Sequence, residues 1–237
     1  MRRFVIMTIA IALSVNAISQ EKEDIGPDYP AIEKTVNDPN SIFYYPPLFS
    51  RYKNNDTTLS FREYKMLYYG SFFRDELSNT EGASIYIIED SLNKIFSLKE
   101  PGTKDWEQVI QLSERYLDKF PFDLKKLNLV YFACKQTGNR VLQRESVDKI
   151  KKLAHVILSS GDGLSETSAL HVIQISDEYS IINMLGYEYN GQRELRGDRC
   201  DYLNLKENED RVQGLYFDLK QLFIQYQKKM NGSQAGK

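Results

Sequence analysis

The stretch "TKDWEQVIQLSERYLDKFPFDLKKLNLVYFACKQTGN", residues 103–139, decides the fold class of the middle of the chain. Thr103 is a good candidate N-cap, and the apolar residues that follow it share one helical stripe. Pro121 ends this helix. The residues after Pro121 are apolar almost all round, which predicts a buried helix with Gly138 at its C-terminal cap. Helical spacing resumes in "VLQRESVDKIKKLAHVILSSGDG", residues 141–163, so we expect the middle of the protein to be helical.

The helix–Pro–helix–Gly–helix run of residues 103–159 resembles a tetratricopeptide-type helical hairpin. Tyr131 and Gln143 stand near positions where that repeat has small residues for close helix packing, and the sequence holds no second copy. An array needs about three repeats to be stable alone. The sequence therefore predicts one hairpin-like unit and not a solenoid.

The stretch "YKNNDTTLSFREY", residues 52–64, invites comparison with a calcium-binding loop. Such a loop needs a carboxylate at its first position and glycine at its sixth, where this chain has Tyr52 and Thr57. Ser60 and Glu63 instead have the spacing of a capping box, in which each side chain accepts from the other residue's backbone N–H. We therefore interpret this stretch as a helix start, with no metal and no cofactor.

The hydrophobic period changes after Ser165. "ALHVIQI" (169–175) and "YSIINMLGYEY" (179–189) are rich in β-branched and aromatic residues, and Asn190-Gly191 is typical of a two-residue hairpin turn. Two further alternating segments, "CDYLNLK" and "GLYFDL", precede a final helix that Asp218 would cap. The sequence predicts an α+β fold, with a helical N-terminal and middle part, an antiparallel meander of about four strands and a C-terminal helix.

The expected domain organisation follows from these segments. Residues 1–19 are a signal peptide, residues 20–165 a helical lobe, and residues 166–230 a β-meander with the terminal helix, packed on the helical lobe. The tail, residues 231–237, is expected to be disordered.

The start of the chain, "MRRFVIMTIAIALSVNAISQ", has the basic, apolar and small-residue regions of a secretory signal peptide. Its apolar run is shorter than the roughly 20 residues that span a bilayer. Cleavage before Gln20 would leave 29 basic and 33 acidic side chains, a net charge of −4. Because no basic stripe remains, a nucleic-acid surface is excluded. We expect a soluble exported protein, periplasmic or secreted, without a transmembrane anchor.

Two groups of residues have alternative interpretations. Cys134 lies in an apolar helical stretch and is expected to be a buried thiol, although export would also permit a bridge to Cys200. Eleven aromatic residues between Phe43 and Phe73 could form a stacking surface, but their helical spacing favours a core.

The segment "SSGDGLSETSALH", residues 159–171, is the candidate site. We expect it to be a functional hinge, because the long helix ends at one of its glycines and polar residues crowd the junction. The candidate binding residues are Ser160, Asp162, Glu166, Thr167 and His171. As an alternative, Asp162, Glu166 and His171 could form the acid–base centre of a hydrolase with Ser160 or Thr167 as nucleophile, but no spacing-specific motif supports this.

Five segments together carry a resemblance to a known family: "YKNNDTTLSFREYKMLYYG", "ILSSGDG", "ALHVIQISDEY", "CDYLNLKENE" and "GLYFDL". In this order they resemble the domain-of-unknown-function 4919 family of exported proteins from gut-dwelling Gram-negative bacteria. The resemblance implies an envelope or secreted location and assigns no activity or catalytic residue. We therefore expect a non-enzymatic protein that binds an envelope protein, a peptide or a glycan, with the hydrolase as the alternative.

Overall fold

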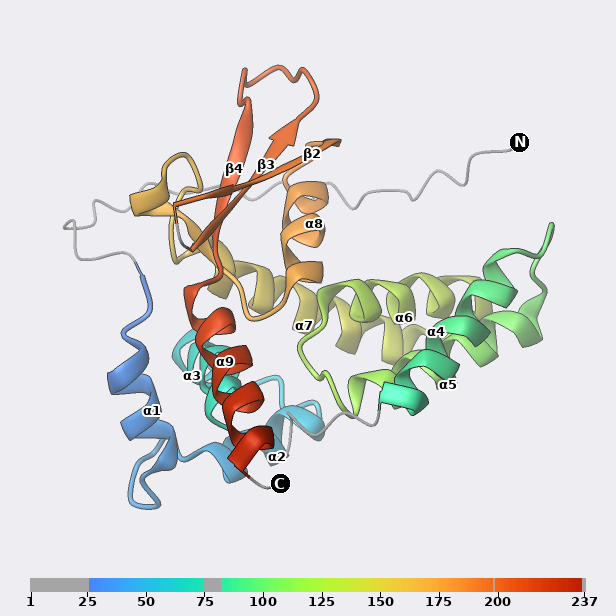
Figure 1. The fold of residues 1–237 in the computed structure, drawn as a ribbon. Helices are drawn as coiled ribbons and strands as arrows, with labels where there is room; N and C mark the ends of the chain where they lie inside the picture. The colour runs from blue at the N-terminus through green and yellow to red at the C-terminus, as the bar shows by residue number, and fades with distance from the viewer. Residues whose placement is uncertain (1–25, 75–81, 198, 236–237) are drawn as a thin grey trace. The chain divides into compact units, whose positions relative to one another are not determined.

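The computed structural model describes residues 26–74, 82–197 and 199–235, which form two compact units (Figure 1). One unit is Pro27–Val156; the other holds Gly26 and the chain from Ile157 onward. The predicted signal peptide, residues 1–19, lies outside the described residues. Among the described residues, no helix is both long and apolar enough to cross a membrane.

The first unit is helical, and its first helix begins at a local capping signal. The N-cap Asp28 accepts a hydrogen bond from the Ala31 N–H at 3.0 Å. Its helices, the last of which runs on into the second unit, are α1 (Tyr29–Asn37), α2 (Tyr45–Lys53), α3 (Phe61–Gly70), α4 (Gly82–Phe96), α5 (Thr103–Leu117), α6 (Leu124–Thr137) and α7 (Arg140–Leu158).

The run of α5, α6 and α7 lies where the sequence predicts it. Gly138 caps α6 in the left-handed conformation, with φ of 78°, as expected. The N-cap of α5 is one residue earlier than predicted, at Gly102 instead of Thr103. The Asp105 carboxylate reaches back to accept from the Gly102 N–H at 2.8 Å, which fixes the earlier start.

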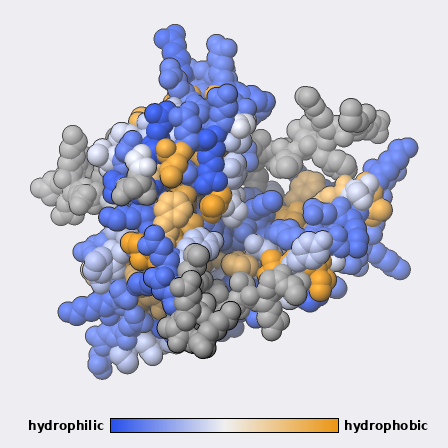
Figure 2. Space-filling model, viewed as in Figure 1, coloured by the Kyte–Doolittle hydropathy of each residue, from blue (hydrophilic) through white to orange (hydrophobic). Residues whose placement is uncertain are grey.

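Six of the eleven aromatic residues between Phe43 and Phe73 are buried in the core of this unit, as the core interpretation predicts, whereas Phe61 is exposed. Tyr64, Tyr68 and Tyr69 are among its largest fully buried side chains. The Tyr52 hydroxyl finds a buried partner by donating to the Pro121 carbonyl at 2.6 Å. A second cluster of buried apolar residues joins α4, α5 and α6, which run side by side in Figure 1. On the side drawn in Figure 2, hydrophobic residues reach the surface only in separate small patches.

The second unit contains a four-stranded sheet of order β1-β4-β3-β2. The α+β fold class is therefore confirmed, but the sheet is mixed: β2, β3 and β4 are antiparallel, and the short β1 is parallel to β4. Its elements are β1 (Leu170–His171), α8 (Ile175–Met184), β2 (Tyr189–Arg196), β3 (Cys200–Leu205), β4 (Gly214–Asp218) and α9 (Lys220–Ala235).

Two predictions about this unit are wrong. "YSIINM" is not a strand but part of α8, because Ile181 and Ile182 bury on one helical face and acidic residues suit its first turn. Asn190-Gly191 is not a hairpin turn but a bulge inside β2: Tyr189 pairs with Leu205 and Arg193 with Leu203, and Gly191 takes φ of 98°. The last helix, α9, is described to Ala235, and disorder of residues 231–237 stays a prediction.

Both cysteines are buried free thiols. Burial raises the pKa of each thiol to about 11, which keeps the thiols protonated at neutral pH. Cys134 is thus the buried small side chain that the sequence predicts.

Candidate functional site

The first candidate residue of the predicted hinge, Ser160, makes two hydrogen bonds to the backbone. Ser160 is 2% exposed, and its hydroxyl donates to the Ile157 carbonyl at 2.6 Å. The same hydroxyl accepts from the His171 backbone N–H at 2.8 Å. Ser160 therefore ties the end of α7 to β1.

Asp162 closes the loop that follows. Its carboxylate accepts from the Ser168 hydroxyl at 2.5 Å and from the Leu164 N–H at 2.9 Å. These bonds, that from Ser168 first, hold the pKa of Asp162 below its usual value. Ser165 extends the network through its own hydroxyl, which lies 2.7 Å from that of Ser168.

The other three predicted residues lie apart from this network or at its edge. Glu166 and Thr167 are exposed, and the Thr167 hydroxyl lies 3.1 Å from that of Ser165. His171 is half-buried, and its ring lies against Gly26, where a Cβ would come within 3.1 Å of the ring Nε2. Ser160 and His171 are joined by the hydrogen bond from the His171 backbone N–H to the Ser160 hydroxyl. A binding or catalytic role for these five residues, including the hydrolase alternative, stays a prediction.

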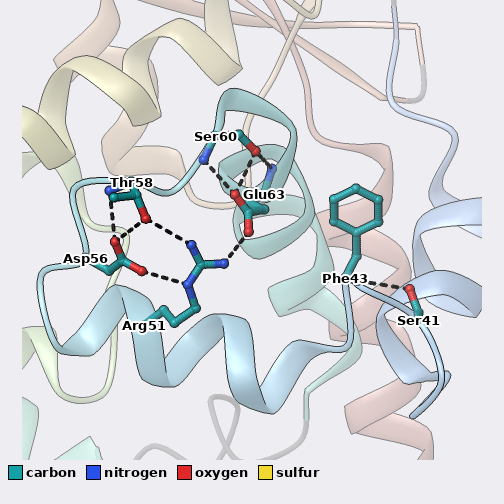
Figure 3. Close-up of polar contacts among 7 residues, drawn as sticks. All are labelled: Ser41, Phe43, Arg51, Asp56, Thr58, Ser60 and Glu63. Carbon is teal, nitrogen blue, oxygen red and sulfur yellow. Dashed lines mark hydrogen bonds and ion pairs between the residues drawn. The ribbon is translucent and has the colours of Figure 1, made fainter.

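The predicted helix start at residues 52–64 is confirmed (Figure 3). Ser60 and Glu63 form both halves of the capping box, and the Glu63 carboxylate accepts from the Ser60 N–H at 2.7 Å. The Arg51 guanidinium, from α2, bonds to Asp56 at 2.7 Å and makes an ion pair with Glu63. The Arg51 guanidinium thus engages both Asp56 and Glu63, the two carboxylates that would have to bind calcium.

The pKa values of these carboxylates follow from their partners. Hydrogen bonds, first from Thr58 and then from Arg51, lower the pKa of Asp56 to about 2. Burial pushes the pKa of Glu63 upward, but the bonds from Ser60 and Arg51 outweigh it and leave the pKa below its usual value. Both carboxylates are ionised and engaged by Arg51 at neutral pH.

The helical unit also contains a pocket that the sequence did not predict. Its volume is about 160 Å³, and α2, α5, α6 and α7 contribute to its walls. The lining is Tyr52, Lys53, Asn55, Glu114, Leu117, Asp118, Pro121, Leu127, Val130, Leu142, Glu145, Ser146 and Lys149.

Two charged groups in this pocket come from α7. Glu145 and Lys149 are four residues apart, so they share one face of the helix. The Lys149 ammonium lies 4.6 Å from the centroid of the Tyr52 ring, in a cation–π contact. Burial lowers the pKa of Lys149, although Glu145 and Glu114 counteract it. The Glu145 carboxylate accepts from the Asn55 side-chain amide at 2.9 Å.

The remaining charges come from α5 and its neighbours. Burial, and then the charge of Asp118, raise the pKa of Glu114. Asp118 itself makes an ion pair with Lys53. Within the described part of the chain, neither the Glu114 carboxylate nor the Lys149 ammonium has a hydrogen bond or an ion pair within 4.0 Å. The pocket therefore holds opposite charges that the protein does not pair with each other.

The sequence alone does not predict this pocket. Glu145 and Lys149, like Glu114 and Asp118, look like ordinary exposed residues four apart on a helix. Only the packing of separate helices brings them together.

Comparison with known proteins places the whole described fold in one family. The family model described as Domain of unknown function (DUF4919) matches residues 30–228. This range includes both the pocket and residues 159–171. No curated protein and no solved structure gives a match.

Proposed function

The chain belongs to the DUF4919 family, and on the geometry of its helical unit we propose that it is a non-enzymatic protein that binds a small ligand. One observation carries this proposal: a pocket of about 160 Å³ whose lining combines aliphatic side chains with Glu114 and Lys149, which make no ion pair in the described structure. Ligand sites combine these two properties, since apolar walls provide affinity and a few polar groups provide orientation.

We further propose that binding takes place outside the cytoplasm, in the bacterial envelope or in the medium. The basic, apolar and small-residue regions of residues 1–20 support this location. The pocket suits a small molecule or one residue of an envelope peptide or protein, and a single sugar of a glycan would also be within its size.

A pair of tryptophan variants tests this proposal. Leu142 lines the pocket and is half-buried, whereas its neighbour Val141 is 68% exposed and does not line it. Leu142→Trp should fill the pocket, while Val141→Trp adds the same side chain outside it. Each mature protein is dialysed to equilibrium against a small-molecule extract of the native cells. Mass spectrometry then identifies compounds that accumulate with the protein.

We expect at least one compound to accumulate with the wild type and with Val141→Trp but not with Leu142→Trp. Circular dichroism melting checks that the variants fold. Leu117→Trp, which fills the pocket from α5, replaces Leu142→Trp if that variant unfolds. The proposal fails if no compound accumulates, or if the pocket-filling variant accumulates the same compounds.

A further inference from the structure

The pocket exposes two opposite charges to the same space. Glu114 from α5 and Lys149 from α7 both line it, and each affects the pKa of the other. Burial shifts both pKa values toward the neutral form, upward for Glu114 and downward for Lys149. Glu114 is exposed at the pocket and Lys149 is half-buried, so a ligand that carries the counter-charges would mainly relieve the desolvation of Lys149.

The other polar groups of the pocket favour a ligand ammonium on one side. Glu145 already accepts one hydrogen bond from Asn55, but a carboxylate can accept several more. The side-chain oxygen of Asn55, Oδ1, is buried without a hydrogen-bond partner in the described structure. Lys53 and Asp118 neutralise each other in an ion pair. Glu114 therefore keeps all its acceptor sites, Glu145 keeps those that Asn55 does not occupy, and Lys149 has the Tyr52 ring as its contact.

Aliphatic side chains form a further part of the lining. Leu117, Leu127, Val130 and Leu142 contribute aliphatic side chains. The volume of about 160 Å³ is close to that of an engineered apolar cavity of about 150 Å³ that holds benzene. An aliphatic side chain of four carbons fits such a space.

We propose that the pocket binds a free α-amino acid with an apolar side chain. Glu114 and Glu145 receive the ammonium group, Lys149 receives the carboxylate, and the aliphatic side chains of the lining receive the side chain. This assignment rests on the proposed binding function and names its ligand class. An amino acid provides both missing counter-charges at once, whereas an amine or a carboxylic acid leaves one pocket charge uncompensated.

Calorimetric titration with L-leucine and two deletion analogues tests the ligand class. 4-Methylpentanoic acid lacks the ammonium group of leucine, and 3-methylbutylamine lacks the carboxylate. We expect L-leucine to bind and each analogue to bind at least about tenfold more weakly, because each leaves a pocket charge without its partner. Binding of an analogue as tight as that of leucine would overturn the assignment.

Two neutral variants test the roles of the charges. Lys149→Met and Glu114→Gln should each weaken leucine binding by about tenfold or more. Lys151→Met, an exposed position on the same helix, should leave binding unchanged. Equal binding by all three variants contradicts the assignment, and melting curves show whether any loss comes from unfolding. The calorimetric and dialysis experiments together separate the two proposals. If leucine does not bind but the dialysis experiment finds another pocket ligand, only the ligand class fails. If dialysis finds none, the binding function fails as well.

Discussion

The carboxyl groups of Glu178 on α8 and Asp201 on β3 are both buried, and they interact with each other. Glu178 is 0% exposed and Asp201 is 2% exposed. Burial, and then the charge of Asp201, raise the pKa of Glu178 to about 9, although Arg193 partly counteracts them. Glu178 is therefore protonated at neutral pH. Among the described residues neither Glu178 oxygen has a hydrogen-bond donor, and a proton on Glu178 supplies the missing bond to Asp201.

Replacing Glu178 by glutamine should make stability less dependent on pH. The folded pKa of Glu178 lies above its unfolded value, so its stabilising effect is complete below the unfolded pKa and is lost as pH rises toward about 9. The wild type should lose up to about 1.4 kcal/mol per pH unit in this window through Glu178. Glu178→Gln, which stays neutral, should lose less. Urea unfolding at several pH values between about pH 5 and pH 8 measures the difference.

Glu209→Gln is the matched control, because Glu209 is exposed. Its stability should follow the pH dependence of the wild type. Parallel curves for Glu178→Gln and the wild type would show that Glu178 is ionised in the folded protein, contrary to the prediction.

Removing the Ser60 cap should destabilise the helical unit. Ser60→Ala deletes the hydroxyl that accepts from the Glu63 N–H at 3.3 Å, and loss of such a cap typically costs about 1 kcal/mol. Ser50→Ala, at an exposed position in α2, should have little effect. Thermal melts measure both changes.

The same melts test whether residues 52–63 bind calcium. Because Arg51 already engages Asp56 and Glu63, curves with millimolar calcium and with chelator should superimpose. A rise in the melting temperature with calcium that disappears in Glu63→Gln would refute this expectation.

The stability of the helical unit should depend on the ion pair between the buried Lys126 and Glu89. Lys126 is 3% exposed, its ammonium lies 2.7 Å from the Glu89 carboxylate, and it also lies 4.7 Å from the centroid of the Tyr116 ring. Glu89→Ala should destabilise the protein by about 2 kcal/mol, since it leaves a buried charge unpaired. Lys126→Met removes the charge while keeping the aliphatic volume and should cost less. Urea midpoints compare them, with the exposed Glu33→Ala as control. A smaller loss for Glu89→Ala than for Lys126→Met would contradict this account.

The parts of the fold that the sequence predicted depend on residues close together in the chain. The Ser60–Glu63 capping box and the Gly138 cap each involve groups within about one helical turn. Such signals act through local hydrogen bonds, so they can be recognised without tertiary structure.

The errors arose where distant neighbours decide the outcome. The β-branched residues of "YSIINM" suit a strand or a buried helix, and only the tertiary packing selects α8. Asn190-Gly191 takes the positive φ that a turn needs, but pairing with β3 places it inside β2. Glu114 and Lys149 line the same pocket only because two separate helices, α5 and α7, both contribute to its walls.

A Ser160 variant tests whether this residue of the predicted hinge has a structural role. Its buried hydroxyl is the partner of the His171 N–H, so Ser160→Ala leaves that N–H without its acceptor. We expect a loss of about 1–3 kcal/mol in the free energy of unfolding and faster hydrogen exchange at the His171 amide. The exposed substitutions Thr167→Ala and Glu166→Gln should change stability by less than about 0.5 kcal/mol. If Ser160→Ala is as stable as the wild type, the hydroxyl does not hold the segment together.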